Sequence, residues 1–196
     1  MTSAAKLSLV LASRSPRREQ ILRMLGFSFA SKMPDFEEII PDGMESERAP
    51  EYLAKGKAAS LANLGDESLV LGSDTMVLLD GRVMGKPEGP ESALEMLSAL
   101  NGRTHRVVTG VALARNGRIL ESGAVTTSVT FAKSRSEVLR DYAFSEEPLD
   151  KAGAYAIQGR GAALVDKVDG CFYNVMGLPV QLTLRLLDPH FKAGAK

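Results

Sequence analysis

Three short segments of the chain carry side chains that could do chemistry, and the first is Ser13-Arg14-Ser15-Pro16-Arg17-Arg18. It lies between an apolar run and a stretch with apolar residues at helical spacing, which predicts a loop leading into a helix. Free backbone N–H groups and the positive end of a helix dipole attract anions at such a loop. Serine hydroxyls add donors, and the arginines can make forked, charge-assisted hydrogen bonds to phosphate. The segment indicates a phosphate site, with a capped surface helix bearing solvated arginines as the alternative.

The second segment is Gly72-Ser73-Asp74-Thr75, which follows the apolar run at residues 68–72. The pattern predicts a carboxylate at the end of a buried strand, where ligands bind in many α/β proteins. Asp74 could there bind a metal or activate water, and the alternative is an aspartate that caps a turn. Downstream, Gly85-Lys86-Pro87 offers a rigid turn with one ammonium group, a pattern that is also typical of a solvated surface lysine.

The third segment is Tyr155-Ala156-Ile157-Gln158-Gly159-Arg160-Gly161. Its glycines let the backbone approach a ligand closely, and Gln158 offers both a donor and an acceptor to a base edge. Short glycine-rich segments are also common turns. Glu37-Glu38 and Lys57 add an acidic pair and a further cation, whereas no Walker-type loop or dinucleotide fingerprint is present.

Strands and helices that must position these segments alternate along the chain, which predicts an α/β fold with a mixed sheet. The helix after the first loop is expected over residues 17–25, with Pro16 in its first turn and Gly26 at its C-terminus. Ser134 and Glu137 form a predicted capping box. The other predicted elements are helices at 49–64, 91–100, 134–144 and 179–187, strands at 7–12, 68–72, 106–114, 118–131, 162–168 and 172–175, and hairpin turns at Asp80-Gly81 and Asn116-Gly117.

Composition narrows the function further. The chain has 196 residues, and its 24 basic and 24 acidic side chains give no net charge, which argues against binding a nucleic-acid polymer. Cys171 is the one cysteine, so no intrachain disulfide can form, and His105 and His190 lack the spacing of zinc ligands. No run approaches the roughly 20 apolar residues of a membrane span. We therefore expect a soluble, cytoplasmic protein without a membrane partner.

Taken together, the segments resemble the Maf family of nucleotide pyrophosphatases, once described as septum-formation inhibitors. The resemblance covers about residues 7–187. Besides the first loop, it rests on motifs in the same order: Gly72-Ser73-Asp74-Thr75, Gly85-Lys86-Pro87, Gly102-Arg103-Thr104-His105, Val108-Thr109-Gly110-Val111, Asp150-Lys151-Ala152-Gly153-Ala154-Tyr155, Ile157-Gln158-Gly159 and Asn174-Val175-Met176-Gly177-Leu178-Pro179.

The resemblance implies a Maf/ITPase-like α/β fold: one domain over residues 1–190, with a central twisted mixed sheet flanked by helices and two lobes around a cleft. It leaves residues 191–196 as a tail and implies a homodimer. It also implies a divalent cation, Mg²⁺ or Mn²⁺, and hydrolysis between the α and β phosphates of a nucleoside triphosphate. The implied roles are general base or metal-linked carboxylate for Asp74, metal binding for Glu38, triphosphate binding and catalysis for Lys57 and Lys86, and substrate binding for Ser13, Arg17, Arg18, Thr75 and Gln158.

Three positions separate the substrate groups within the family. The group resembling 7-methyl-GTP pyrophosphatases tends to have Trp, Gln and Glu where this chain has Arg17, Thr75 and Gln158. All three residues favour the dTTP/UTP group. The Gln158 amide can donate to one pyrimidine carbonyl and accept from N3–H. The alternatives are a 7-methyl-GTP pyrophosphatase and a nucleotide-binding inhibitor of septum formation.

Overall fold

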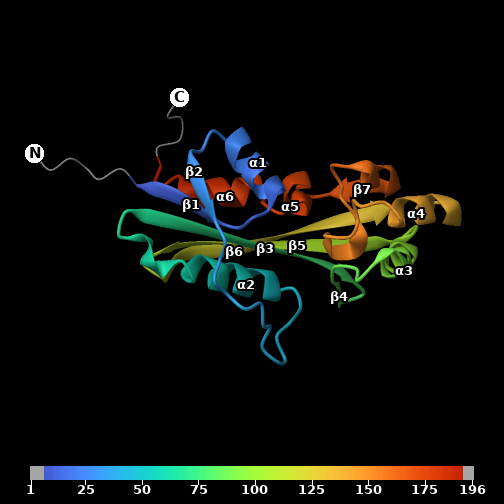
Figure 1. Cartoon of the computed structure of the whole chain (residues 1–196), viewed down its shortest axis with the longest axis horizontal. Helices are drawn as coiled ribbons and strands as arrows, with labels where there is room; N and C mark the ends of the chain where they lie inside the picture. Colours follow the sequence, from blue (N-terminus) through green and yellow to red (C-terminus); the bar gives the residue numbers. More distant parts are fainter. Residues whose placement is uncertain (1–6, 192–196) are drawn as a thin grey trace, which may run out of the picture. The chain divides into compact units, whose positions relative to one another are not determined.

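A mixed β-sheet runs through the computed structural model, which describes residues 7–191 (Figure 1). The strand order is β2-β1-β3-β5-β6-β7, with β4 paired to β3 off this path. β1 is parallel to both β2 and β3, whereas the pairs β3–β4 and β6–β7 are antiparallel. The predicted α/β fold with a mixed sheet is confirmed. The strands are β1 (Ser8–Ala12), β2 (Phe29–Lys32), β3 (Ser68–Leu79), β4 (Arg82–Met84), β5 (Thr104–Arg115), β6 (Arg118–Phe131) and β7 (Val165–Asp169).

Two compact units make up the described chain. Unit 1 contains the chain up to Asp74, then Thr109–Val125 and the chain from Gly177 onward, and unit 2 contains Thr75–Val108 and Thr126–Met176. β3, β5 and β6 each contribute residues to both units. Most of the tail predicted at residues 191–196 lies outside the described residues. Its first residue, Phe191, packs edge-to-face on Phe27, with the ring centroids 6.0 Å apart.

Unit 1 packs helices on both faces of its part of the sheet. α2 (Ala49–Ala59) covers one face, and α1 (Pro16–Met24) and α6 (Val180–Leu187) lie on the other (Figure 1). Small side chains let α2 come close to the strands: a Cβ at Gly72 would lie 2.3 Å from the carbonyl oxygen of Ala54. Only glycine fits there. The buried cluster under α2 consists of Val10, Ala12, Ala54, Ala58, Val70, Ala112 and Ala114.

Unit 2 contains the rest of β3, β5 and β6, the strands β4 and β7, and the remaining helices. α3 (Pro90–Leu100) packs against α4 (Ser136–Ala143). The rings of His105, Phe131 and Tyr155 make edge-to-face pairs in its core. The other elements are the short helices η2 (Ala152–Ala154), η3 (Arg160–Leu164) and α5 (Phe172–Met176), while η1 (Ala62–Leu64) belongs to unit 1.

Both predicted hairpin turns are confirmed, because Asp80-Gly81 and Asn116-Gly117 have the positive φ angles that such two-residue turns require. The predicted capping box is wrong: α4 begins after Arg135 and has no side-chain cap. Ser134 instead exchanges two hydrogen bonds with the side chain of Asn101, at 2.8 and 3.0 Å.

Several further elements differ from the prediction. The helix predicted at 49–64 ends at Ala59, and the strand predicted at 162–168 begins only at Val165, after η3. The strand expected at 172–175 is the helix α5, although its aromatic and β-branched residues favour strands. The buried side chain of Asn174 donates hydrogen bonds to the Val107 carbonyl and the Thr127 hydroxyl, and these tertiary contacts override the local preference. β2 was not predicted, since most of its residues are exposed and it lacks an apolar run. Within residues 7–191, no helix is both long and apolar enough to span a membrane.

Candidate active site

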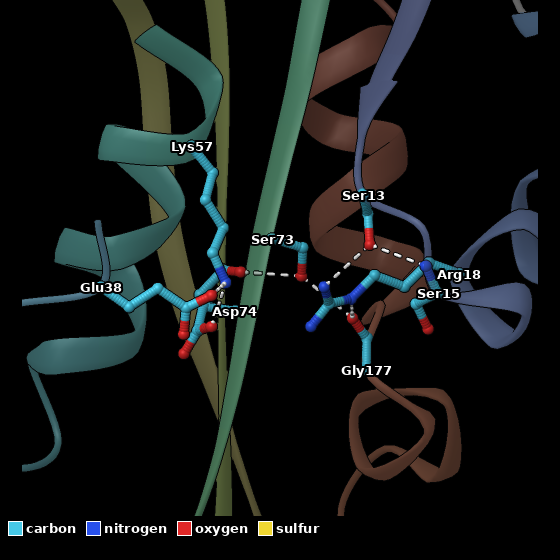
Figure 2. A network of polar contacts seen from close by, with 9 residues as sticks. Ser13, Ser15, Arg18, Glu38, Lys57, Ser73, Asp74 and Gly177 are labelled. Carbon is cyan, nitrogen blue, oxygen red and sulfur yellow. Dashed lines mark hydrogen bonds and ion pairs between the residues drawn. The ribbon is translucent and has the colours of Figure 1, made fainter. Parts of the chain in front are cut away.

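A buried ammonium group joins two carboxylates in unit 1 (Figure 2). Lys57 Nζ lies 2.6 Å from Asp74 Oδ1 and 2.8 Å from Glu38 Oε1. The side chains of Lys57 and Asp74 are 8% and 10% exposed, whereas that of Glu38 is 57% exposed. Burying an ion pair is costly unless its partners are well placed, and here one cation serves two anions.

The position of Asp74 corrects the prediction that it ends a strand. β3 continues through Asp74 to Leu79, so this carboxylate lies inside a long, almost fully buried strand. Side chains alternate along a strand, which places Asp74 on the same face as Gly72. That face lies against α2, and the missing side chain at Gly72 lets α2 approach closely enough for Lys57 to reach the carboxylate.

On the opposite face of β3 lies a second polar group, formed by Ser13, Arg18, Ser73 and Gly177 (Figure 2). Arg18 comes from the first turn of α1, which begins at Pro16 as predicted. Its guanidinium donates to the Ser13 hydroxyl at 3.2 Å and to the Gly177 carbonyl at 2.9 Å. The Ser73 hydroxyl also lies 2.9 Å from the Gly177 carbonyl. These contacts fix the guanidinium next to the loop that the sequence indicates as a phosphate site.

Electrostatics connect the two polar groups. Desolvation by burial lowers the pKa of Arg18, and the nearby charge of Asp74 acts against this change. Arg17 lowers the same pKa further, while Glu38 raises it. Both carboxylates are therefore close enough to the guanidinium to influence it. An anionic ligand at this loop would meet two arginines together with a carboxylate that lies against a lysine.

The structure brings five of the predicted site residues into contact or close electrostatic range: Ser13, Arg18, Glu38, Lys57 and Asp74. Arg17 is linked to them through its effect on Arg18. The sequence prediction assigned no role to Ser73 or Gly177. Both lie in motifs that carry the family resemblance, but Gly177 acts through its backbone carbonyl, which no residue type reveals.

The remaining predicted residues, Thr75, Lys86 and Gln158, belong to unit 2. Thr75 follows Asp74 directly in β3 and is half-buried. Lys86 is exposed, on a turn held by a 3.0 Å hydrogen bond from the Gly153 N–H to the Gly85 carbonyl.

Gln158 is exposed and lies on a loop that the side chains of Glu147, which is half-buried, and Tyr142, which is buried, hold in place. The Glu147 carboxylate accepts hydrogen bonds from the backbone N–H groups of Arg160 and Gly161, each at 3.0 Å. The hydroxyl of Tyr142 donates to the same carboxylate and accepts from the Ala156 N–H. The loop thus has fixed ends on both sides of Gln158, as a residue that reads a base would need.

The two carboxylates around Lys57 are chemically suited to a divalent cation. Mg²⁺ prefers oxygen ligands and is usually bound by one or two carboxylates together with substrate phosphates and water. Glu38 and Asp74 already lie around one positive charge, the Lys57 ammonium. Among the residues that the structure describes, no group of three or more His, Cys, Asp or Glu side chains could hold a metal. The donor set therefore fits an ion that substrate phosphates help to bind.

Comparison with known proteins decides the family, because the family model described as Maf-like protein matches residues 8–190. The chain belongs to the Maf family. Three curated relatives of this Maf protein are each named dTTP/UTP pyrophosphatase. The one from Bacillus velezensis is 42% identical and spans 91% of this chain and 94% of the relative. The one from Desulfitobacterium hafniense is 45% identical and spans 88% of this chain and 81% of the relative. The one from Salmonella typhimurium is 45% identical and spans 95% of this chain and 94% of the relative.

Among solved structures, the Staphylococcus aureus Ham1 protein is similar to this Maf protein at 17% identity. The match covers 65% of this chain and 73% of that chain, with a TM-score of 0.43. This likeness is too distant to add to the assignment.

Proposed function

We propose that this Maf protein hydrolyses dTTP and UTP to the nucleoside monophosphate and pyrophosphate. The observation that carries the proposal is the buried contact between Lys57 and Asp74, with Glu38 on the same ammonium and Arg18 in electrostatic range. Relatives named dTTP/UTP pyrophosphatase, at 42–45% identity over most of the chain, support the same activity.

In the proposed reaction, a water oxygen attacks the α-phosphorus and the bond to the bridging oxygen of the β-phosphate breaks. Asp74 accepts the water proton through its second oxygen, because Oδ1 already accepts from Lys57. Ser13, Arg17 and Arg18 hold phosphate oxygens, and Lys86 adds a further cation for the leaving pyrophosphate. Charge on that leaving group is what fixed cations stabilise best. Glu38 and Asp74 would hold Mg²⁺ or Mn²⁺, which when bound supplies further neutralisation of phosphate charge.

Selection of pyrimidines is the finer part of the proposal. Arg17, Thr75 and Gln158 are the residues that favour dTTP and UTP over 7-methyl-GTP. The loop that Glu147 and Tyr142 hold would present the Gln158 amide to the base. The family resemblance further leads us to expect a homodimer in the cytoplasm.

A nucleotide panel tests the proposal. Purified protein with Mg²⁺ or Mn²⁺ should release pyrophosphate from dTTP and UTP in preference to CTP, GTP and 7-methyl-GTP. Loss of a general base typically costs about 10²–10⁴-fold in rate, so Asp74→Asn should lose at least 10²-fold in kcat. Asp80→Asn is the matched control, because Asp80 is exposed on the turn that follows the same strand. It should keep full activity.

Other outcomes would change the conclusion in defined ways. Near-normal turnover by Asp74→Asn would show that this carboxylate is not the base. Activity on 7-methyl-GTP alone would keep the reaction but overturn the pyrimidine assignment. If folded protein released pyrophosphate from no nucleotide, the inhibitor of septum formation would become the better description.

A further inference from the structure

Glu38 comes from a part of the chain with little regular structure. It lies between β2 and α2, in a segment without helix or strand that Figure 1 shows extending beyond α2. Most residues from Met33 to Arg48 are exposed. Fixing a backbone residue in one conformation costs about 1–2 kcal/mol of entropy, so a carboxylate on such a segment needs an anchor to stay in place.

The anchor that the structure shows is the aromatic ring of Phe36, which lies directly on Gly56 of α2. A Cβ atom built at Gly56 would lie only 2.2, 2.3 and 2.7 Å from Phe36 Cζ, Cε2 and Cε1. Real Cβ atoms do not approach other atoms this closely. The ring therefore occupies the space that any other side chain at position 56 would fill.

Both residues of this contact are close in sequence to a residue of the site. Phe36 precedes Glu38 by two residues, and Gly56 directly precedes Lys57. With the ring on α2, the Glu38 carboxylate lies 2.8 Å from the Lys57 ammonium despite its 57% exposure. Glycine inside a helix costs about 1 kcal/mol relative to alanine, so α2 is weakened at the residue where the ring is seated.

We propose that the seating of Phe36 on Gly56 is a positioning contact that holds Glu38 at the Lys57–Asp74 pair. The inference rests on the proposed function, in which Glu38 helps to bind the divalent cation. Phe36 acts only through the backbone that carries Glu38, and its ring is a positioning group. The contact therefore links the ordering of the exposed segment that carries Glu38 to the formation of the cation site.

Gly56→Ala separates this role from a structural one, because the two roles predict opposite changes in stability. The added methyl group should displace the Phe36 ring while favouring the helix, so the free energy of unfolding should stay equal or rise. Groups that orient metal ligands typically change affinity by about 10–100-fold, so we expect Mn²⁺ to bind about tenfold more weakly. Binding is measured by electron paramagnetic resonance with a non-hydrolysable UTP analogue, beside urea unfolding. The Mn²⁺ concentration for half-maximal pyrophosphate release should rise similarly, with kcat at saturating Mn²⁺ nearly unchanged.

A rescue variant and a control sharpen the test. Phe36→Leu replaces the ring with a smaller aliphatic side chain, so the double variant Gly56→Ala/Phe36→Leu should recover part of the Mn²⁺ affinity, a non-additivity typical of residues in contact. Gly89→Ala is the control, because a Cβ there meets nothing within 4 Å. It should bind Mn²⁺ as the wild type does.

The failures are distinguishable. Wild-type Mn²⁺ affinity and metal requirement in Gly56→Ala would overturn the positioning role, even if dTTP and UTP are hydrolysed as proposed. Lower stability of Gly56→Ala, with activity falling in proportion, would also overturn it, because the contact would then serve folding. If the wild type hydrolyses no nucleotide, the proposed function fails, and a tenfold difference in Mn²⁺ binding would still support the positioning contact.

Discussion

Among the described residues, the buried charged side chains, Lys57 and Asp74, belong to unit 1, whereas the buried polar side chains of unit 2 are neutral. In unit 1, Lys57 and Asp74 share a short ion pair with almost no exposure to water. In unit 2, the buried His105 ring accepts or donates one hydrogen bond, at 2.8 Å from the Tyr155 hydroxyl, and burial lowers its pKa to about 4. His105 is therefore uncharged at neutral pH.

A buried ion pair and a buried neutral hydrogen bond differ in what they contribute to stability. A buried ion pair often contributes no more to stability than apolar residues of the same shape, because desolvating two charges is costly. A neutral hydrogen bond contributes about 0.5–1.5 kcal/mol without that cost. We therefore predict that the buried charges of unit 1 serve chemistry on an anionic ligand and that the neutral contacts of unit 2 serve folding. Three predictions test this contrast.

The largest effect is expected for Lys57→Met, which leaves Asp74 buried without its ammonium partner. Removing one member of a buried ion pair typically costs about 3–5 kcal/mol, so the free energy of unfolding should fall by about that amount. Asp74→Asn should cost much less, since Lys57 keeps Glu38 at 2.8 Å. Urea unfolding of both variants measures the asymmetry. Equal losses of unfolding free energy in the two variants would contradict the asymmetry. If Asp74 binds the cation, Mg²⁺ should stabilise Lys57→Met more than the wild type.

A smaller effect is expected in unit 2 for Asn174→Ala. The Asn174 amide is fully buried and donates to the Val107 carbonyl at 2.9 Å and the Thr127 hydroxyl at 3.0 Å. Leaving buried partners unpaired costs about 1–3 kcal/mol, so we expect a loss of about 2–3 kcal/mol in unfolding free energy. Gln181→Ala, which removes an exposed amide, should change stability little. If Asn174→Ala were as stable as the wild type, unit 2 would not depend on its neutral contacts.

The sequence predicted the class of fold and the first loop because these depend on local patterns. Pro16 and Gly26 bound α1, and both two-residue hairpin turns have the expected glycine. The prediction that Asp74 ends a strand was wrong for a physical reason. A charge in an apolar run normally marks a strand end, but here a lysine 17 residues away neutralises it inside the strand.

Prediction of the site from sequence is limited in the same way, because tertiary contacts are not visible in residue types. Residue types and the family resemblance led to Ser13, Arg18, Glu38, Lys57 and Asp74, and the structure places these in two polar groups within electrostatic range of each other. Their catalytic roles stay predictions. The backbone carbonyl of Gly177, which accepts from Arg18, and the Phe36 ring on Gly56 depend on tertiary contacts. Such contacts leave no signal in residue type or spacing.

The last and smallest effect is a pH dependence of stability that originates in unit 2. Burial lowers the pKa of His105 from 6.5 to about 4, so the unfolded chain binds a proton more readily than the folded one. The stability that neutral His105 provides is fully present above about pH 6.5 and is lost as the pH falls toward the folded pKa. Lowering the pH from about 7 to about 5 should therefore reduce the free energy of unfolding by about 2 kcal/mol through this residue alone.

His105→Phe isolates that contribution, because an aromatic ring that cannot be protonated replaces the imidazole between Phe131 and Tyr155. Carboxylates elsewhere also titrate, but they do so in both proteins and cancel when the two pH dependences are subtracted. Urea unfolding at the two pH values should show the wild type losing about 2 kcal/mol more than the variant. His190→Gln, at an incompletely buried histidine, is the control for the loss of an imidazole. Identical slopes for His105→Phe and the wild type would mean that His105 binds its proton as readily in the folded state as in the unfolded chain, and the contrast between the two units would fail.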